Sequence, residues 1–536
     1  MNPRNYPKHV LLALTLIACL HSIAGRAEVA LPNIFSDHMV IQRQQPIRIF
    51  GTANPGEMVT VEFAGESGKA ETDAEGDWRV QLPAVAADRS PRDMTIQGKN
   101  TITLSDILVG DVWLCSGQSN MEWYLQNSAN AKQEIDAATF PEIRLFDVKG
   151  HTVSRLPKNN TTGKWARCSP NTARSFSAVA YFFGRTLYEQ TKIPVGLIGT
   201  NWGGTRIEPW IPASGFENIQ ELDYISKGLK RLDLTTPEGK ARHAKYISSV
   251  KQWAKEAGEK IKAGQHPGNP PAPPSFNTVQ GATTIYNSMV HGIAPFSVRG
   301  ALWYQGESNG EEGQIYYHKM KALIAGWRRT FENPNMLFYF VQLANWQAPN
   351  NDPAGGDGWA PIRDAQRKTL DIPYTGMAVI TDIGDADDIH PRNKQDVGKR
   401  LAQWGLRDVH DVDTVPSGPL IKTAVRDGIS MRISFDHVGK GLMVAKKTGL
   451  DPTKETPDES LAHFSIAGAD KKWHWADAKI DGETVMVSSP AVKEPVAVRY
   501  AYSMNPEGAN LYNRDGLPAS PFRTDDWEAE KEPKNK

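Results

Sequence analysis

Five uninterrupted apolar runs of strand length in the middle of the chain limit its fold more than any other feature. They lie in the segments DVWLCSG, VGLIGTNWGG, GALWYQGES, LFYFVQLAN and GMAVITDIG, and helix-favouring segments separate them. A strand that is apolar on both faces needs cover on both faces, and strands that alternate with helices usually pair in parallel. The sequence therefore predicts an α/β domain with a doubly wound parallel sheet, over about residues 106–405.

The regions on either side of this domain consist of short alternating runs that are broken by turn residues. Residues 28–105 include PIRIFGTANPGEMVTVEFAG, which predicts two strands around the turn Asn54-Pro55-Gly56. Residues 406–525 include KKWHWADAKIDGETVMVSSP and PVAVRYAYSM, which show the same short alternating runs and turn residues. We therefore expect an all-β module on each side of the α/β domain, and a disordered charged tail at 526–536.

Residues 214–274 predict an insertion within the α/β domain. The segment EGKARHAKYISSVKQWAKEAGEKIKAG is a charged helical pattern. HPGNPPAPPSF, which follows it, is too rich in proline for a helix or a strand. We expect a helix that continues into a rigid linker.

The N-terminus has the layout of a secretory signal peptide. Arg4 and Lys8 precede an apolar run, and small residues follow it up to Ala27. We expect cleavage after residues 1–27 and a secreted or periplasmic protein, because no later segment approaches the roughly 20 apolar residues of a membrane-spanning helix. The alternative is a lipid anchor on Cys19, because LIAC resembles a bacterial lipobox.

Charge and cysteine content exclude several classes of function. Lysine plus arginine and aspartate plus glutamate both number 61, so no net charge draws the chain towards nucleic acid. Without the signal peptide two cysteines remain, Cys115 and Cys168, which either form a disulfide or are buried separately. They cannot form a zinc site, because no further cysteine or histidine pair accompanies them. The oligomeric state stays open.

Polar residues follow four of the predicted strands, at the point where each strand ends. Ser119 follows VWLC, the pair Gly203-Gly204 follows VGLIG, and Gln305 follows GALWY. Asp387 and His390 follow MAVITD. Because ligands of an open parallel sheet lie beyond the carboxyl ends of its strands, we expect these residues to meet. Together they are the parts of an acyl-transfer site.

Ester hydrolysis assigns a role to each of these residues. Ser119 is the candidate nucleophile, His390 the base that takes its proton, and Asp387 the carboxylate that orients the histidine. Asp388 is the neighbouring alternative to Asp387, although the Asp-x-x-His spacing favours Asp387. We expect no metal or cofactor, since a calcium loop that starts at Asp385 would need glycine where His390 stands.

A developing oxyanion needs hydrogen-bond donors that are already in place, each lowering the barrier by about 3 kcal/mol. The candidates are the backbone amide of Ser119, an amide of Gly203 or Gly204, and the side-chain amide of Gln305.

Four motifs in order resemble one family. GQSNMEW, WGGTRIEPW, WYQGESN and DIHPRNKQDVGKRLA are similar to the SGNH-type sialate O-acetylesterases and their bacterial carbohydrate acetylesterase relatives, and the likeness covers nearly the whole mature chain. The resemblance implies an SGNH-hydrolase-type fold and the triad Ser119, Asp387 and His390. It also implies that Gln305 stands where the wider SGNH group has asparagine.

We therefore expect a serine carbohydrate O-acetylesterase that forms an acetyl-serine intermediate. Trp123 and Trp202 flank the serine and glycine motifs and are candidate sugar platforms, with core packing as the alternative. Arg206 is the candidate arginine for binding the carboxylate of sialic acid, unless Glu307 or Glu208 occupies it. Plant polysaccharides such as xyloglucan or xylan are the alternative substrates. An inactive carbohydrate-binding surface protein is the alternative function.

Overall fold

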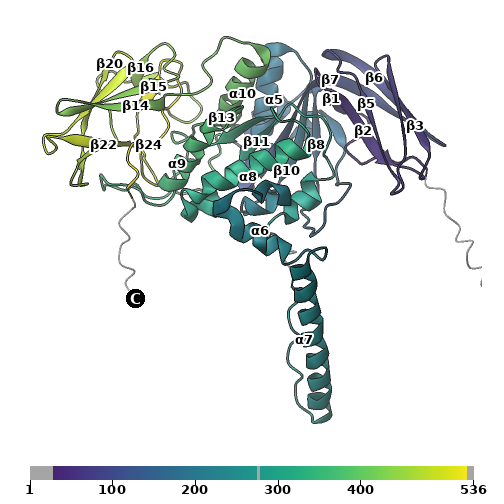
Figure 1. The fold of residues 1–536 in the computed structure, drawn as a ribbon. Helices are drawn as coiled ribbons and strands as arrows, with labels where there is room; N and C mark the ends of the chain where they lie inside the picture. The colour runs from purple at the N-terminus through teal and green to yellow at the C-terminus, as the bar shows by residue number, and fades with distance from the viewer. Residues whose placement is uncertain (1–27, 275–277, 528–536) are drawn as a thin grey trace, which may run out of the picture.

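The computed structural model describes residues 28–274 and 278–527. Three bodies lie in a row, with an α/β domain between two β modules, and a long helix projects from the central body (Figure 1). The predicted signal peptide and the candidate anchor Cys19 lie outside the described residues, as does most of the predicted tail. Among the described residues, the helices are too short or too polar to cross a membrane.

The central sheet contains six strands that pair in parallel. Their spatial order is β13 (Thr375–Ala378), β12 (Leu337–Val341), β11 (Gly300–Tyr304), β7 (Thr101–Gly117), β10 (Val195–Asn201) and β8 (Phe140–Asp147), and β9 (Trp165–Cys168) adds an antiparallel edge. The five apolar runs correspond to β7, β10, β11, β12 and β13. The predicted α/β class is confirmed, with a mixed sheet. The chain changes direction across the sheet at β7, and this places the residues after β7 where ligands of such sheets bind.

Helices cover both faces of the sheet, as the doubly apolar strands require. In β12, Phe338 contacts Trp327 of α8 (Ile315–Thr330), and the next residue, Tyr339, contacts Trp404 of α10 (Lys394–His410). Because neighbouring residues of a strand point to opposite faces, α8 and α10 lie on opposite sides. Helix α5 (Ala178–Thr191) packs beside α10, and α9 (Ala360–Lys368) packs against α8.

The N-terminal module shares a strand with the central sheet. The first part of β7 pairs with β1 (Val40–Gln42) and β6 (Asp88–Gln97), and its last residues pair with β10 and β11. The predicted boundary at residue 105 therefore falls inside one continuous strand. The other strands of the module are β2 (Ile47–Thr52), β3 (Met58–Phe63), β4 (Glu66–Glu71) and β5 (Asp77–Leu82).

The C-terminal module consists of three antiparallel sheets. Their orders are β14-β15-β21-β20, β19-β18-β22-β24 and β17-β16-β23. The strands are β14 (Leu420–Asp427), β15 (Ser430–Asp436), β16 (Leu442–Lys446), β17 (Lys454–Glu455), β18 (Phe464–Gly468), β19 (Trp473–Trp475), β20 (Asp477–Asp481), β21 (Thr484–Ser488), β22 (Pro495–Tyr500), β23 (Leu511–Asn513) and β24 (Phe522–Arg523).

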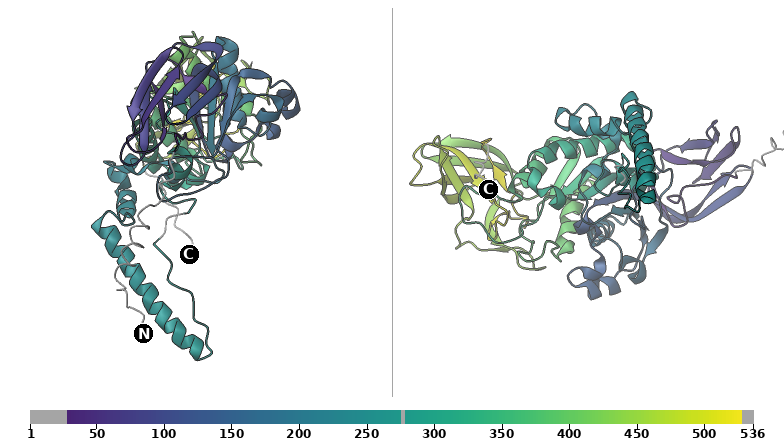
Figure 2. Two further views of the ribbon diagram at one scale, coloured as in Figure 1. Left: turned by 90° about the vertical axis from the view of Figure 1, so that its right-hand side faces the viewer. Right: turned by 90° about the horizontal axis from the view of Figure 1, so that it is seen from below.

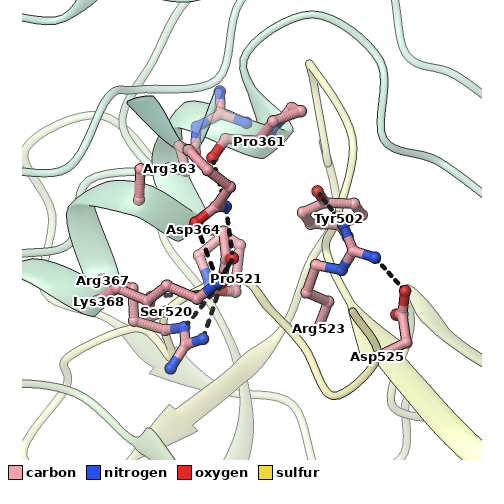
Figure 3. Close-up of polar contacts among 12 residues, drawn as sticks. Pro361, Arg363, Asp364, Arg367, Lys368, Tyr502, Ser520, Pro521, Arg523 and Asp525 are labelled. Atoms are coloured by element: carbon pink, nitrogen blue, oxygen red, sulfur yellow. Dashed lines mark hydrogen bonds and ion pairs between the residues drawn. The ribbon is translucent and has the colours of Figure 1, made fainter. Parts of the chain in front are cut away.

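The fully buried Arg363 of α9 joins the C-terminal module to the central domain. Its guanidinium donates to the Ser503 and Met504 carbonyls of the module and to the Leu343 and Ala344 carbonyls of the α/β domain. Figure 3 shows this junction, where α9 with Arg363 faces the segment of the module that carries Tyr502.

The predicted insertion contains α6 (Asp223–Lys230) and α7 (Pro237–Lys262). Helix α7 projects away from the body, and the proline-rich segment after it returns beside the helix (Figure 2). Pro237 at the first helical position and the Thr236 side chain, which accepts a hydrogen bond from the Gly239 amide, fix the start of the helix. The two cysteines, Cys115 and Cys168, are free and buried, so the alternative of a disulfide is wrong.

Candidate active site

Ser119 begins the short helix α2 (Ser119–Glu122) directly after β7. The turn between them requires glycine, because Gly117 has φ +146° and a Cβ there would lie 2.1 Å from the Tyr304 carbonyl oxygen of β11. The Gln118 amide donates to the same carbonyl at 3.0 Å. The serine is therefore held on a tight turn at the carboxyl edge of the sheet. Its amide, in the first turn of a helix, has no acceptor within that helix.

His390 reaches Ser119 from the loop between β13 and α10. Its Nε2 lies 2.8 Å from Ser119 Oγ, the distance of a hydrogen bond. Trp123 stacks on the imidazole, with ring centroids 5.0 Å apart and an interplanar angle of 15°. Burial and, secondly, the charge of Lys394 lower the pKa of His390 below its ordinary value. The imidazole is therefore neutral at neutral pH and can accept the serine proton.

The carboxylate beside the histidine is Asp388. Its Oδ1 accepts the backbone amide of His390 at 2.8 Å and lies 3.6 Å from the ring Nδ1. The latter distance is an ion-pair contact and exceeds a hydrogen bond. Asp387, which the Asp-x-x-His spacing favours, is exposed, and its amide donates to Asp385. The geometry therefore favours the alternative, Asp388.

Of the glycine pair, Gly203 lies against the serine. A Cβ on Gly203 would be 3.3 Å from Ser119 Cβ, but its amide donates to Glu122 Oε2 at 2.6 Å. Gly204 is exposed, with φ +73° and open space where a Cβ would be. In this conformation the Gly203 amide is engaged by a carboxylate.

The structure argues against the expected donor role of Gln305. The side chain is fully buried, and its Nε2 lies within hydrogen-bond distance of Gln118 Oε1, the Thr205 carbonyl and Asn309 Oδ1. Its Oε1 accepts from the Tyr316 hydroxyl. Both amide hydrogens therefore have acceptors inside the protein. Gln305 therefore connects the segments that follow β7, β10 and β11, and its role is to hold these segments together.

Of the two alternative partners for Arg206, Glu307 does not pair with it. Arg206 makes ion pairs with Glu208 and Glu312, as one of the alternatives allowed. Glu307 instead accepts a hydrogen bond from Asn120 Nδ2 at 2.6 Å. Burial raises the pKa of Glu307.

The two candidate platforms, Trp123 and Trp202, are half-buried near the serine, and Trp202 also packs against the hydrophobic core. Trp202 stacks on His151, with centroids 4.7 Å apart, and His151 Nε2 lies 3.1 Å from Glu122 Oε1. The sequence interpretation missed His151, because its loop has no recognisable pattern. It also missed Asn120 and Glu122, although both belong to the quoted motif GQSNMEW.

Within residues 28–274 and 278–527, no group of three histidine, cysteine, aspartate or glutamate side chains is placed to hold a metal ion. The aspartates near His390 have other partners. Asp382 forms an ion pair with Arg400, and Asp388 contacts His390.

Comparison with known proteins gives one consistent match. The model of a family described as carbohydrate esterase, sialic acid-specific acetylesterase, matches residues 109–236 and 247–407. A sialate O-acetylesterase of Rattus norvegicus is 28% identical and covers 96% of this chain and 98% of its own. The sialate O-acetylesterase of Homo sapiens is 29% identical, with 91% of each chain covered.

A solved structure agrees with these relatives. A carbohydrate acetylesterase from Xanthomonas citri superposes with a TM-score of 0.75 at 36% identity, over 93% of this chain and 100% of its own. The match extends through both β modules, since they lie within that coverage. The interval between the two family segments, 237–246, coincides with the start of the projecting helix α7.

Proposed function

Because this chain belongs to the carbohydrate esterase family of sialic acid-specific acetylesterases, we propose that it removes acetyl groups from sugar hydroxyls with Ser119 as the nucleophile. Membership of the family makes the chain a carboxylic ester hydrolase. The observation that carries the choice of nucleophile is the 2.8 Å contact between Ser119 Oγ and His390 Nε2 at the carboxyl edge of the parallel sheet. The strand order around β7 also supports an SGNH-type sheet.

In the first half of the proposed reaction, Ser119 Oγ attacks the carbonyl carbon of the acetyl ester while His390 Nε2 takes the hydroxyl proton. The tetrahedral intermediate carries a negative charge on the former carbonyl oxygen. When it collapses, the bond to the sugar oxygen breaks, and His390 gives its proton to that oxygen. The sugar leaves with a free hydroxyl, and Ser119 carries the acetyl group.

In the second half, water replaces the sugar. His390 takes a proton from the water, whose oxygen attacks the acetyl carbonyl carbon. Collapse of this second intermediate breaks the bond to Ser119 Oγ, which takes the proton back from His390. Acetic acid leaves and loses its proton to the solvent as acetate, and the starting state returns.

Asp388 is the proposed partner of the histidine, with Asp387 as the alternative. An imidazolium forms in each half of the reaction, and a carboxylate beside Nδ1 stabilises it. The contact of 3.6 Å supports Asp388 for this role, together with its bond to the His390 amide. A shorter contact in the substrate complex would agree with the usual tightening of catalytic hydrogen bonds.

The proposed oxyanion donors are the Ser119 amide and the glycine turn that follows β10. Ser119 is at the first position of the short helix α2, where its amide has no acceptor within the helix and can donate to an oxyanion. Gly204 contributes its amide directly, and Gly203 contributes after Glu122 releases it. Gln305 is left out of this set, since its side-chain hydrogens already have acceptors.

The proposed substrate is an acetylated carbohydrate of the type that sialate O-acetylesterases act on. A sialic acid would present a carboxylate, and Arg206 would have to exchange Glu208 or Glu312 for it. The stacked pair of Trp202 and His151 and the exposed part of Trp123 offer flat faces for a sugar ring. The layout of residues 1–27 supports export of the protein to a compartment where such glycans occur.

The experiment that tests this function measures acetate. The purified protein is incubated in parallel with acetylated sialoglycans, acetylated xyloglucan and acetylated xylan, and acetate release is measured for each. We expect release from at least one of them and turnover of a simple aryl acetate. An inactive binding protein would release no acetate from any of the four, and that result would overturn the proposal.

A further inference from the structure

A fully buried lysine lies next to the Ser119–His390 pair. Lys394 is the first residue of helix α10 and is 0% exposed. Within the described ranges, no carboxylate oxygen lies in ion-pair range of its Nζ. A lysine at this place is costly, because burial disfavours its charge and the N-terminus of a helix repels it. A buried lysine that carries this cost beside a candidate active site indicates a functional role.

Two sets of contacts connect Lys394 with the reacting side chains. Its Nζ donates to Asn120 Oδ1, and Asn120 directly follows Ser119. The Nδ2 of the same asparagine donates to the Ile389 carbonyl at 3.0 Å, which is the peptide bond that precedes His390. One hydrogen-bonded amide thus joins the serine segment to the histidine segment, and Lys394 orients that amide.

The second contact passes through an aromatic ring. Lys394 Nζ lies 5.7 Å from the centre of the Trp123 ring and 5.5 Å from that of Tyr304. These are cation–π distances. Trp123 in turn stacks on the His390 imidazole. The ammonium therefore also supports the ring against which the base lies.

We propose that Lys394 is a positioning residue of the esterase site, which joins the segments of Ser119 and His390 and supports the Trp123 ring on which the imidazole stacks. The inference rests on the proposed function, because it needs His390 as the base. Lys394 itself touches neither the reacting oxygen nor the acetyl group. It acts through Asn120 and Trp123.

The charged groups around Lys394 determine whether it raises or lowers the pKa of His390. Glu307 and Asp388 face it with negative charge, while His390 and Tyr304 are its titratable neighbours. Burial lowers the pKa of Lys394 to about 7, and the two carboxylates oppose this shift. At the acidic pH where His390 takes up its proton, Lys394 is therefore charged, and its charge lowers the pKa of His390. Loss of Lys394 moves protonation of His390 to higher pH.

The experiment compares three variants with the wild type on an aryl acetate. Lys394→Met keeps the length of the side chain without its charge. Lys399→Met is the matched control, because Lys399 is exposed on the same helix. The double variant Lys394→Met with Glu307→Gln removes both buried charges, so that the neighbouring carboxyl is not left uncompensated. For each, kcat, KM, the pH profile of kcat/KM and the melting temperature are measured.

The positioning role predicts a kcat about tenfold lower or more in Lys394→Met, with a smaller change in KM and an acid limb at higher pH. The double variant should regain thermal stability and keep both kinetic changes. Lys399→Met should match the wild type. NMR titration of the His390 ring should show a higher pKa in the double variant than in the wild type. This measurement does not depend on turnover.

Two results would overturn this inference and leave the proposed function intact. An active wild type whose Lys394→Met variant keeps both kcat and the acid limb would contradict it. So would a double variant that regains wild-type kcat and pH profile together with its stability, because Lys394 would then serve folding only. Absence of turnover in the wild type would instead overturn the proposed function, and this inference with it.

Discussion

At the scale of single residues, the state of the His390 imidazole decides whether Ser119 can react. A protonated imidazole cannot accept the serine proton. Burial and Lys394 place the pKa of this group below its ordinary value of 6.5. We predict that kcat/KM falls on acidification with a midpoint below pH 6.5. A midpoint above pH 6.5, measured where chemistry limits the rate, would contradict the statement that burial and Lys394 lower the pKa of His390.

The two neighbouring aspartates, Asp387 and Asp388, can be distinguished by the effect of each on His390. Asp388 raises the pKa of His390 against the larger effect of burial. Asp388→Asn should therefore lower kcat about tenfold or more and move the acid limb to still lower pH. Asp387→Asn is the matched control, because Asp387 is exposed, and it should stay near the wild-type rate. The opposite ranking of the two variants would return the role to Asp387.

The sequence could not separate these two carboxylates for a physical reason. Asp387 and Asp388 are neighbours in a loop, and backbone torsions alone decide which carboxylate turns to the ring. The Asp388 oxygen accepts the His390 amide two residues later, which is a local turn that spacing rules do not contain. The sequence did predict that Ser119 and His390 meet, because each follows a strand of the parallel sheet.

At the scale of elements, the buried Gln305 holds together the segments that follow β7, β10 and β11. Gln305→Glu would place a carboxylate oxygen where the NH₂ now meets acceptors from Gln118, Thr205 and Asn309. We predict a loss of roughly 2–3 kcal/mol or more in the free energy of unfolding. Denaturant unfolding measures it. A variant with wild-type stability and a hundredfold lower kcat would restore the oxyanion-donor role.

The strands themselves were predictable to different degrees. β7, β10, β11, β12 and β13 are apolar on both faces, so their runs are visible in the sequence. β8 was missed, because its sequence, FPEIRLFD, is no continuous apolar run: Pro141, Glu142 and Arg144 interrupt it. The single strand that joins two modules was also missed. Nothing in the sequence shows that the turn-rich pattern before residue 105 and the apolar run after it share β7.

At the scale of the whole molecule, Arg363 connects two bodies. Arg363→Leu would leave the carbonyls of Leu343, Ala344, Ser503 and Met504 without their donor. We predict a loss of about 3 kcal/mol or more in the free energy of unfolding, with earlier unfolding of the C-terminal module. Calorimetry of the intact chain checks this. A single transition at the wild-type temperature would contradict the role of this arginine.

The central claim is that Ser119 is the nucleophile, and the rate of Ser119→Ala tests it most directly. The measurement is acetate release from the best acetylated carbohydrate, at equal concentrations of wild-type and variant protein with matching melting temperatures. The site predicts a kcat at least about a hundredfold lower in the variant, since binding and the remaining donors give only residual catalysis. A folded Ser119→Ala protein that keeps more than about a hundredth of the wild-type rate would show that another group attacks the ester.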